Sequence, residues 1–274
     1  MKKLFYLLGL ALIMYHVFFL SSCNKNSETL GVSRVQNNFS NDNDTKPVIV
    51  NSTLSMQRLN EINEMMLSKD FKFIHDKYSL MICDSVQKWR RYDMLDSIIS
   101  NNVWDMIING LEGDLKLSKE EIITIANTIN MSKETFYNFE PKSWISQVPQ
   151  NWQSFYSDVT DSVRECEDLT EENILILLEE KRLYWRNILD PSLVDKSIDI
   201  AKSSYTHWIN DVDCLVENEL VLRLTDKQKA GIGLAEDDIG GAIWGGIFGG
   251  LAGACLGAVG GTLVGAIKLA IHGY

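Results

Sequence analysis

The C-terminal segment constrains this chain most, because it is uncharged and glycine recurs along it every four positions. From Ile239 to Ile267 no residue carries a charge, and twelve of the chain's 18 glycines lie between Gly240 and Gly273. Residues four apart lie on one side of an α-helix. The spacing therefore predicts a helix with one smooth strip that lacks side chains, formed by Gly241, Gly245, Gly249, Gly253, Gly257, Gly261 and Gly265.

Such a helix is not expected to be stable alone in water. Each glycine costs about 1 kcal/mol relative to alanine in a helix, so the row of seven costs roughly 7 kcal/mol. The strip needs a closely packed backbone partner or a membrane. At 1.5 Å per residue the 29 uncharged residues reach about 43 Å, enough to cross a ~30 Å hydrocarbon core. A bend at Gly260-Gly261 would leave Ile239–Val259 as the span.

This tail, residues 236–274, resembles the glycine-zipper segments of bacterial envelope proteins and, more loosely, the small glycine-zipper bacteriocins. The resemblance implies helices that pair closely, insert in membranes and in some members form pores. We expect membrane lipid as a partner, with self-association or a membrane helix pairing through the strip. Burial in a groove of the chain's own domain, or in the core of a homo-oligomer, stays open.

The N-terminus has the features of a secretory signal peptide. Lys2 and Lys3 precede an apolar run from Leu4 to Leu20. The following Ser21-Ser22-Cys23 resembles a bacterial lipobox, which implies cleavage between Ser22 and Cys23 and a lipid on the Cys23 thiol. We therefore expect a signal peptide over residues 1–22 and an exported protein anchored by lipid to a bacterial membrane. The alternative is an uncleaved anchor with an incidental cysteine.

Between the two ends, the pattern predicts a tether followed by a helical domain. Residues 23–55 are rich in Asn and Ser, which is typical of a flexible linker, although Val48-Ile49-Val50 would suit a short extended stretch. Residues 56–235 repeat apolar positions at three- and four-residue steps. The fold class is therefore all-α: an acidic helical domain followed by a long apolar C-terminal helix or helical hairpin.

Local signals mark helix ends in this domain. Ser118 and Glu121 form a predicted capping box. Thr170 is a predicted N-cap without the box, and Asp190 is a predicted N-cap followed by a proline. Asn109-Gly110 is predicted to end a helix.

Composition and motifs favour no enzyme class. A net charge of −11 argues against binding nucleic acid. The chain has no nucleophile elbow, no zinc-protease helix and no phosphate loop, and its paired glutamates are adjacent, so they diverge by about 100° on a helix. We expect no metal and no cofactor, since the spacings His75…Cys83 and His207…Cys214 exceed those of structural zinc sites. One disulfide among Cys83, Cys166 and Cys214 is compatible with export, although the sequence does not choose the pair, and free buried cysteines are the alternative.

These observations favour a non-enzymatic cell-envelope lipoprotein whose tail packs or inserts in a membrane or self-associates. The alternative is a bacteriocin-like or effector toxin that permeabilises membranes through the tail. An enzyme in the helical domain is a third class, which no sequence motif supports.

Overall fold

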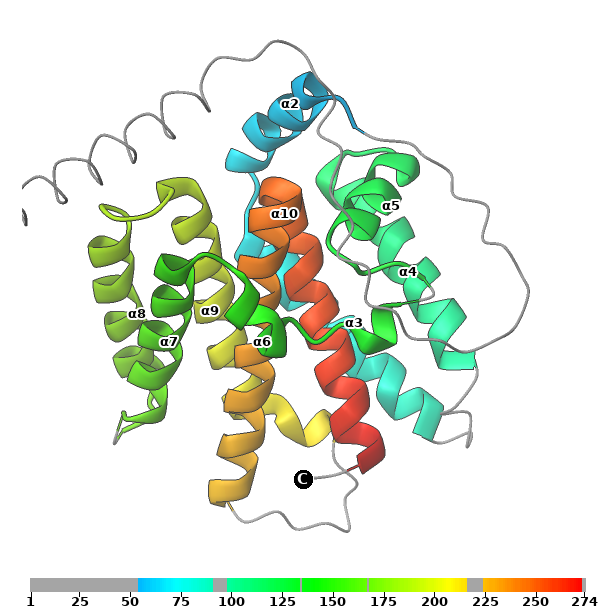
Figure 1. Ribbon diagram of the computed structural model, residues 1–274. Helices are drawn as coiled ribbons and strands as arrows, with labels where there is room; N and C mark the ends of the chain where they lie inside the picture. The colour runs from blue at the N-terminus through cyan, green and yellow to red at the C-terminus, as the bar shows by residue number, and fades with distance from the viewer. Residues whose placement is uncertain (1–53, 91–97, 134, 167, 216–223, 273–274) are drawn as a thin grey trace, which may run out of the picture. The chain divides into compact units, whose positions relative to one another are not determined.

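The computed structural model describes residues 54–90, 98–133, 135–166, 168–215 and 224–272. The signal peptide, Cys23, the tether and Val48-Ile49-Val50 lie outside these ranges. Within them the chain is helical and has no strand, which confirms the all-α prediction. Figure 1 shows the α-helices and the short 3₁₀ turns (η), which are α2 (Met56–Leu67), α3 (Phe71–Arg90), α4 (Ile98–Leu115), α5 (Lys119–Thr128), η1 (Phe136–Asn138), α6 (Pro141–Trp144), η2 (Ile145–Gln147), α7 (Gln150–Arg164), α8 (Glu171–Trp185), α9 (Pro191–Asp211), η3 (Val212–Leu215) and α10 (Leu224–His272).

The glycine-rich tail belongs to α10, which is a helical hairpin with a sharp reversal at Gly250. Gly250 has φ +67° and ψ −165°, so the helix stops there and restarts in the opposite direction. In Figure 1 the two arms, orange and red, run side by side. The hairpin packs against α2, α3, α5, α6, α7 and α9. It therefore fills the centre of the helical domain.

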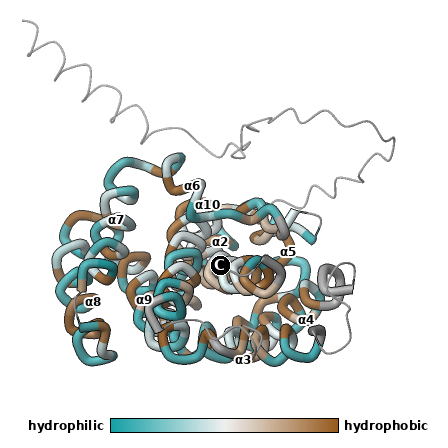
Figure 2. Tube along the Cα trace, turned by 90° about the horizontal axis from the view of Figure 1, so that it is seen from below, coloured by the Kyte–Doolittle hydropathy of each residue, from teal (hydrophilic) through white to brown (hydrophobic). Residues whose placement is uncertain are grey.

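The tail is not separate from the domain. Residues 52–274 form one compact unit, and the boundary predicted between residues 235 and 236 falls inside α10. The view along the hairpin in Figure 2 places α10 among the other helices. The segment between Ala235 and Ile267 is largely buried by them, including Ile239, Ala254 and Leu256 at 0 % exposure.

The three predicted N-caps can be compared with the structure. Ser118 and Glu121 form the capping box: the Ser118 Oγ accepts the N–H of Glu121, and the Glu121 carboxylate accepts the N–H of Ser118. Asp190 caps α9 by accepting the N–H of Leu193 at 2.8 Å. Thr170 occupies the N-cap of α8 as predicted, although its side chain makes no capping hydrogen bond.

The predicted helix end at Asn109-Gly110 was wrong, because α4 continues to Leu115. Gly110 has another role. A Cβ at this position would lie 2.5 Å from the Oη of Tyr78 in α3, so glycine allows α4 to pack closely against the Tyr78 ring. Here the need for close packing outweighs the poor helix propensity of glycine.

One disulfide joins two elements that both pack on the hairpin. Cys83 in α3 is bonded to Cys214 in η3; their Cα atoms are 5.6 Å apart, and the two residues are 131 positions apart in sequence. Cys166 is a partly exposed free thiol, and Cys255 is a buried free thiol on the second arm of α10.

Candidate functional site

The two arms of α10 meet through the glycines of the predicted strip. Gly241 faces Gly257 and Gly245 faces Gly253, and each pair is equally far from Gly249 in sequence. A Cβ on any of these four would penetrate the backbone carbonyl of its partner. The backbones therefore touch directly, as the small-residue pattern requires.

The remaining glycines of the strip have different neighbours. Gly261 faces the backbone of Asp237, which extends the same register towards the open end of the hairpin. Gly265 lies against the side chains of Leu234 and Asp237. Gly249, next to the reversal, lies under side chains of α5 instead of the other arm.

The predicted bend at Gly260-Gly261 was wrong, and the register gives the reason. A reversal beside Gly249 brings the strip of one arm onto the strip of the other, whereas a bend ten residues later would leave most of the strip without an opposing backbone. Gly260 instead lets the second arm approach Met131 and Phe139. The other arm of the tail is thus the partner of the strip.

The reversal is fixed by α2. The Asn63 Oδ1 accepts the N–H of Leu251, the first residue of the second arm, at 2.9 Å. A side chain at Gly250 would collide with the Asn63 amide, and its positive φ disfavours other residues. Asn63 therefore satisfies a helix N-terminus that the reversal leaves unbonded.

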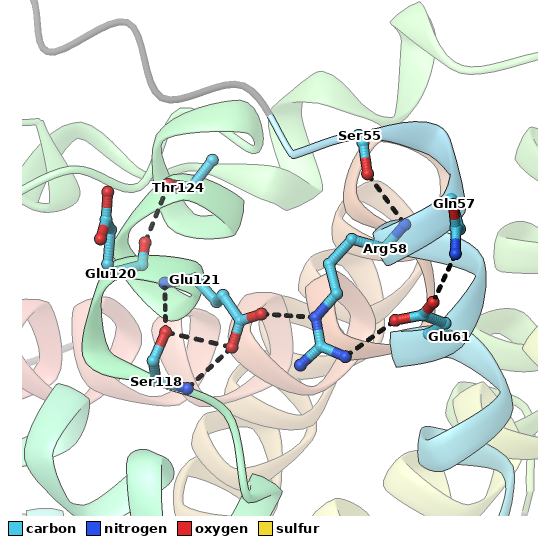
Figure 3. A network of polar contacts seen from close by, with 8 residues as sticks. All are labelled: Ser55, Gln57, Arg58, Glu61, Ser118, Glu120, Glu121 and Thr124. Atoms are coloured by element: carbon cyan, nitrogen blue, oxygen red, sulfur yellow. Dashed lines mark hydrogen bonds and ion pairs between the residues drawn. The ribbon is translucent and has the colours of Figure 1, made fainter.

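Figure 3 shows how α2 is held over the hairpin through α5. Arg58 Nε donates to Glu121 at 2.6 Å, and an Arg58 Nη donates to Glu61 at 3.1 Å. The Arg58 hydrogen bond is the main reason why the pKa of Glu121 is lowered. Ser118 binds the other oxygen of the same carboxylate, so the capping box of α5 and the attachment of α2 share one residue.

At the other end of the strip, a buried polar cluster connects the two arms with α3 and α9. The Asp238 Oδ2 accepts from Trp208 Nε1 at 3.0 Å and also from the Ser204 hydroxyl. The same oxygen lies 3.0 Å from His75 Nε2, while Thr262 on the second arm donates to the other oxygen, Oδ1, at 2.7 Å. Asp238 is fully buried, so each of these bonds replaces one to water.

This cluster contains the residue types of a hydrolase triad but offers no approach to a substrate in this conformation. His75 Nδ1 lies 2.8 Å from the Ser203 hydroxyl, and its Nε2 faces Asp238. His75 is 2 % exposed and Ser203 is 0 % exposed. The geometry therefore suits a fixed contact between helices.

Two more acidic residues precede Asp238: Glu236, which is also buried, and Asp237, which is partly exposed. Glu236 is 1 % exposed and pairs with Lys142 in α6 and with Arg164 in α7. The pKa of Asp237 is raised to about 7, chiefly by burial; Lys142 and Lys268 oppose this shift, and Asp238 and Glu236 add to it. The first arm thus enters the core through three consecutive carboxyl groups.

No family model matches this chain, and neither does a curated protein or a solved structure. The description of the site therefore depends on the geometry alone. The segment Asp226–Ala270 is long and apolar enough to cross a membrane, but 83 % of its most apolar window is buried inside the domain. The core helix of a soluble protein passes the same test.

The acidic triplet was the part of the site that the sequence reasoning missed. The triplet directly precedes the uncharged segment. A signal was present, because Asp237 lies four residues before Gly241 of the glycine strip, and Asp238 lies four before Ala242, which begins a neighbouring row of small residues with Gly246 and Gly250. Side chains in line with these rows lie on the packed side of the helix.

Other chemistry is weakly represented in the described part of the chain. No three His, Cys, Asp or Glu side chains there come together as a metal would require. A shallow pocket between α7 and α8 includes Asp158, but its two oxygens are already bonded to Lys181 and to Trp185, each at 2.7 Å. Cys83, which the zinc hypothesis paired with His75, is bonded to Cys214 instead.

Proposed function

We propose that the protein is an exported, lipid-anchored envelope protein without catalytic activity, whose helical domain carries the glycine-zipper tail as an internal hairpin and acts at a membrane surface. The observation that carries the proposal is the backbone contact between the arms at Gly245 and Gly253. This contact explains how a segment with the composition of a membrane helix can be buried inside a domain that also has exposed polar faces, because each arm covers the glycine strip of the other.

The same contact favours lipid over a second copy as the partner of the tail. The strip that would pair with another molecule is covered by the chain's own second arm. Self-association through the strip would require the hairpin to open and to lose the Asn63 and Asp238 hydrogen bonds. We therefore place the interaction with the membrane on the outside of the folded domain and at the lipid on Cys23.

The Cys83–Cys214 bond supports export, because disulfides persist in oxidising compartments and are rare in the cytosol. Lipidation is tested by Cys23→Ser in the native bacterium. We expect the variant to lose the mass of the lipid and to keep residues 1–22, because a lipobox without its lipidated cysteine is not cut and the apolar run Leu4–Leu20 then stays as an anchor. Cys166→Ser, which changes a partly exposed thiol in the domain, is the matched control and should keep both the lipid and the cut N-terminus. An unmodified Cys23 in the wild-type protein would contradict the proposal.

The state of the tail is tested with a chain that starts at Asn24 behind an ordinary cleaved secretion signal. Because the hairpin is buried, we expect this lipid-free protein to leave the membrane pellet in a carbonate wash. Retention in the pellet would indicate an inserted tail. It would favour the second candidate function, permeabilisation by the tail, for which the apolar length of Asp226–Ala270 is the supporting observation. Release of dye from vesicles by the full lipid-free chain would then decide between permeabilisation and inert insertion.

A further inference from the structure

An aromatic patch lies on the outside of the hairpin next to its reversal. Phe248 is 43 % exposed, although it is two residues from Gly250 in an otherwise buried helix. Its ring centroid lies 4.4 Å from that of Trp244, and Trp244 lies 5.0 Å from Trp144 of α6. Trp144, Trp244 and Ile247 are each partly exposed. We call Trp144, Trp244, Ile247 and Phe248 the tip patch.

We infer that the tip patch is the surface with which the anchored domain contacts the lipid bilayer. This inference depends on the proposed function, because it takes the bilayer to be the one that holds Cys23. The occupant is lipid, at the depth of the headgroups and the first carbons of the chains.

The chemistry of the patch suits that depth. Indole rings combine an apolar body with one N–H donor and are enriched at membrane interfaces. The N–H of Trp244 is already bonded to the carbonyl of Ile129 at 3.0 Å, so the exposed part of this ring is apolar. No residue from Ile239 to Ile267 carries a charge, so this part of the hairpin brings no ionised group to the bilayer.

The place where the chain enters the domain favours contact between the patch and the bilayer that holds Cys23. The predicted tether ends at α2, and α2 is bonded to the reversal through Asn63 and Leu251. The chain that follows Cys23 therefore enters the domain through the helix that holds the reversal, and the tip patch begins two residues from that reversal.

The rival surface is on α8. Ile176 is 54 % exposed and Leu183 is 60 % exposed, and Tyr184 beside them is 59 % exposed. Among the described helices α8 packs against α7 and α9, whereas α2, through which the chain enters the domain, packs against α10. Ile176 therefore provides a control that matches Phe248 in being apolar and exposed.

The test places one environment-sensitive nitrobenzoxadiazole (NBD) label at Phe248→Cys or at Ile176→Cys. Both variants also carry Cys166→Ser, and Cys255 is buried with a pKa raised to about 12 by that burial, so neither native thiol competes. Each chain starts at Asn24 after a histidine tag and is held on vesicles with nickel-chelating lipids. This anchor works whether or not Cys23 is lipidated in the cell, so failure of this inference is distinct from failure of the proposed function.

We expect the label at position 248 to shift to shorter wavelength and to gain intensity several-fold on anchored vesicles. Lipids that carry a doxyl group near the headgroup should quench it best, and the label at position 176 should change little. An unchanged label at 248, or equal responses from both labels, would overturn the inference. Quenching that is strongest at the ends of the lipid chains would also overturn it, because the hairpin would then be inserted and not docked.

Discussion

Replacing single glycines with alanine separates two contributions to the stability of this fold: the poor helix propensity of glycine, and the close backbone packing that only glycine allows. At Gly113, in an exposed part of α4, an added Cβ meets nothing within 4 Å. Alanine there should only improve helix propensity, and we expect about 1 kcal/mol of added stability. At Gly245 the same Cβ would lie 2.0 Å from the carbonyl oxygen of Gly253. Ordinary contact begins at roughly 3.4 Å.

The arms must therefore separate by more than about 1 Å near Gly245 to admit one methyl group. Overpacking of a tight core costs roughly 1–3 kcal/mol. The obstacle here is backbone, which cannot rotate away, so the upper part of that range applies. After the propensity gain of about 1 kcal/mol is subtracted, Gly245→Ala should destabilise the domain by about 2 kcal/mol.

Urea and thermal unfolding of the lipid-free chain measure both effects. With about 2–4 °C per kcal/mol for a domain of this size, Gly245→Ala should lower Tm by about 4–8 °C and Gly113→Ala should raise it by about 2–4 °C. Gly253→Ala should behave like Gly245→Ala. The double variant should cost less than the sum, because one separation of the arms admits both methyl groups. If alanine at Gly245 or Gly253 stabilises the chain as it does at Gly113, the arms are not in backbone contact.

Three further results are expected from the same unfolding measurements. The folded pKa of Asp237 is raised above its unfolded value, so this residue lowers stability progressively as pH rises from about 4 to 7. Asp237→Asn should therefore stabilise the chain at pH 8 and have little effect at pH 4. An effect that does not change with pH would refute the raised pKa of Asp237. Asp238→Ala should cost roughly 3 kcal/mol or more because His75, Ser204, Trp208 and Thr262 all lose their carboxylate partner inside the core, and a loss below about 1 kcal/mol would show that the cluster rearranges or admits water. Reduction of Cys83–Cys214, which closes a loop of more than a hundred residues, should cost roughly 3–5 kcal/mol and lower Tm by about 10 °C, with Cys166→Ser unaffected; an unchanged Tm in reductant would mean that the bond does not form.

What the sequence predicted correctly depends on interactions between neighbours in the chain. The cap of α5 at Ser118 and that of α9 at Asp190 are formed by residues three positions apart, and the helical periods of α2 to α9 record which face of each helix is buried. The glycine strip belongs to the same class, since its spacing alone implies a closely approaching backbone.

What the sequence did not predict depends on residues far apart in the chain. The strip does not say which backbone covers it, and the place of the reversal follows from pairing one arm with the other. Gly110 looked like a helix end because its neighbour Tyr78 is supplied by another helix. The partners of Asp238 come from α3, α9 and the second arm, and no spacing along the chain records that meeting.

The central position of α10 also affects the order in which the domain can form. The ribosome makes α10 after every other described helix, yet α3 and α9 bury their inner faces against it. Until those residues emerge, the faces of α3 and α9 that α10 covers have no partner and stay available to chaperones and to aggregation. We therefore expect the core to be completed only late in synthesis, which would suit the export proposed above.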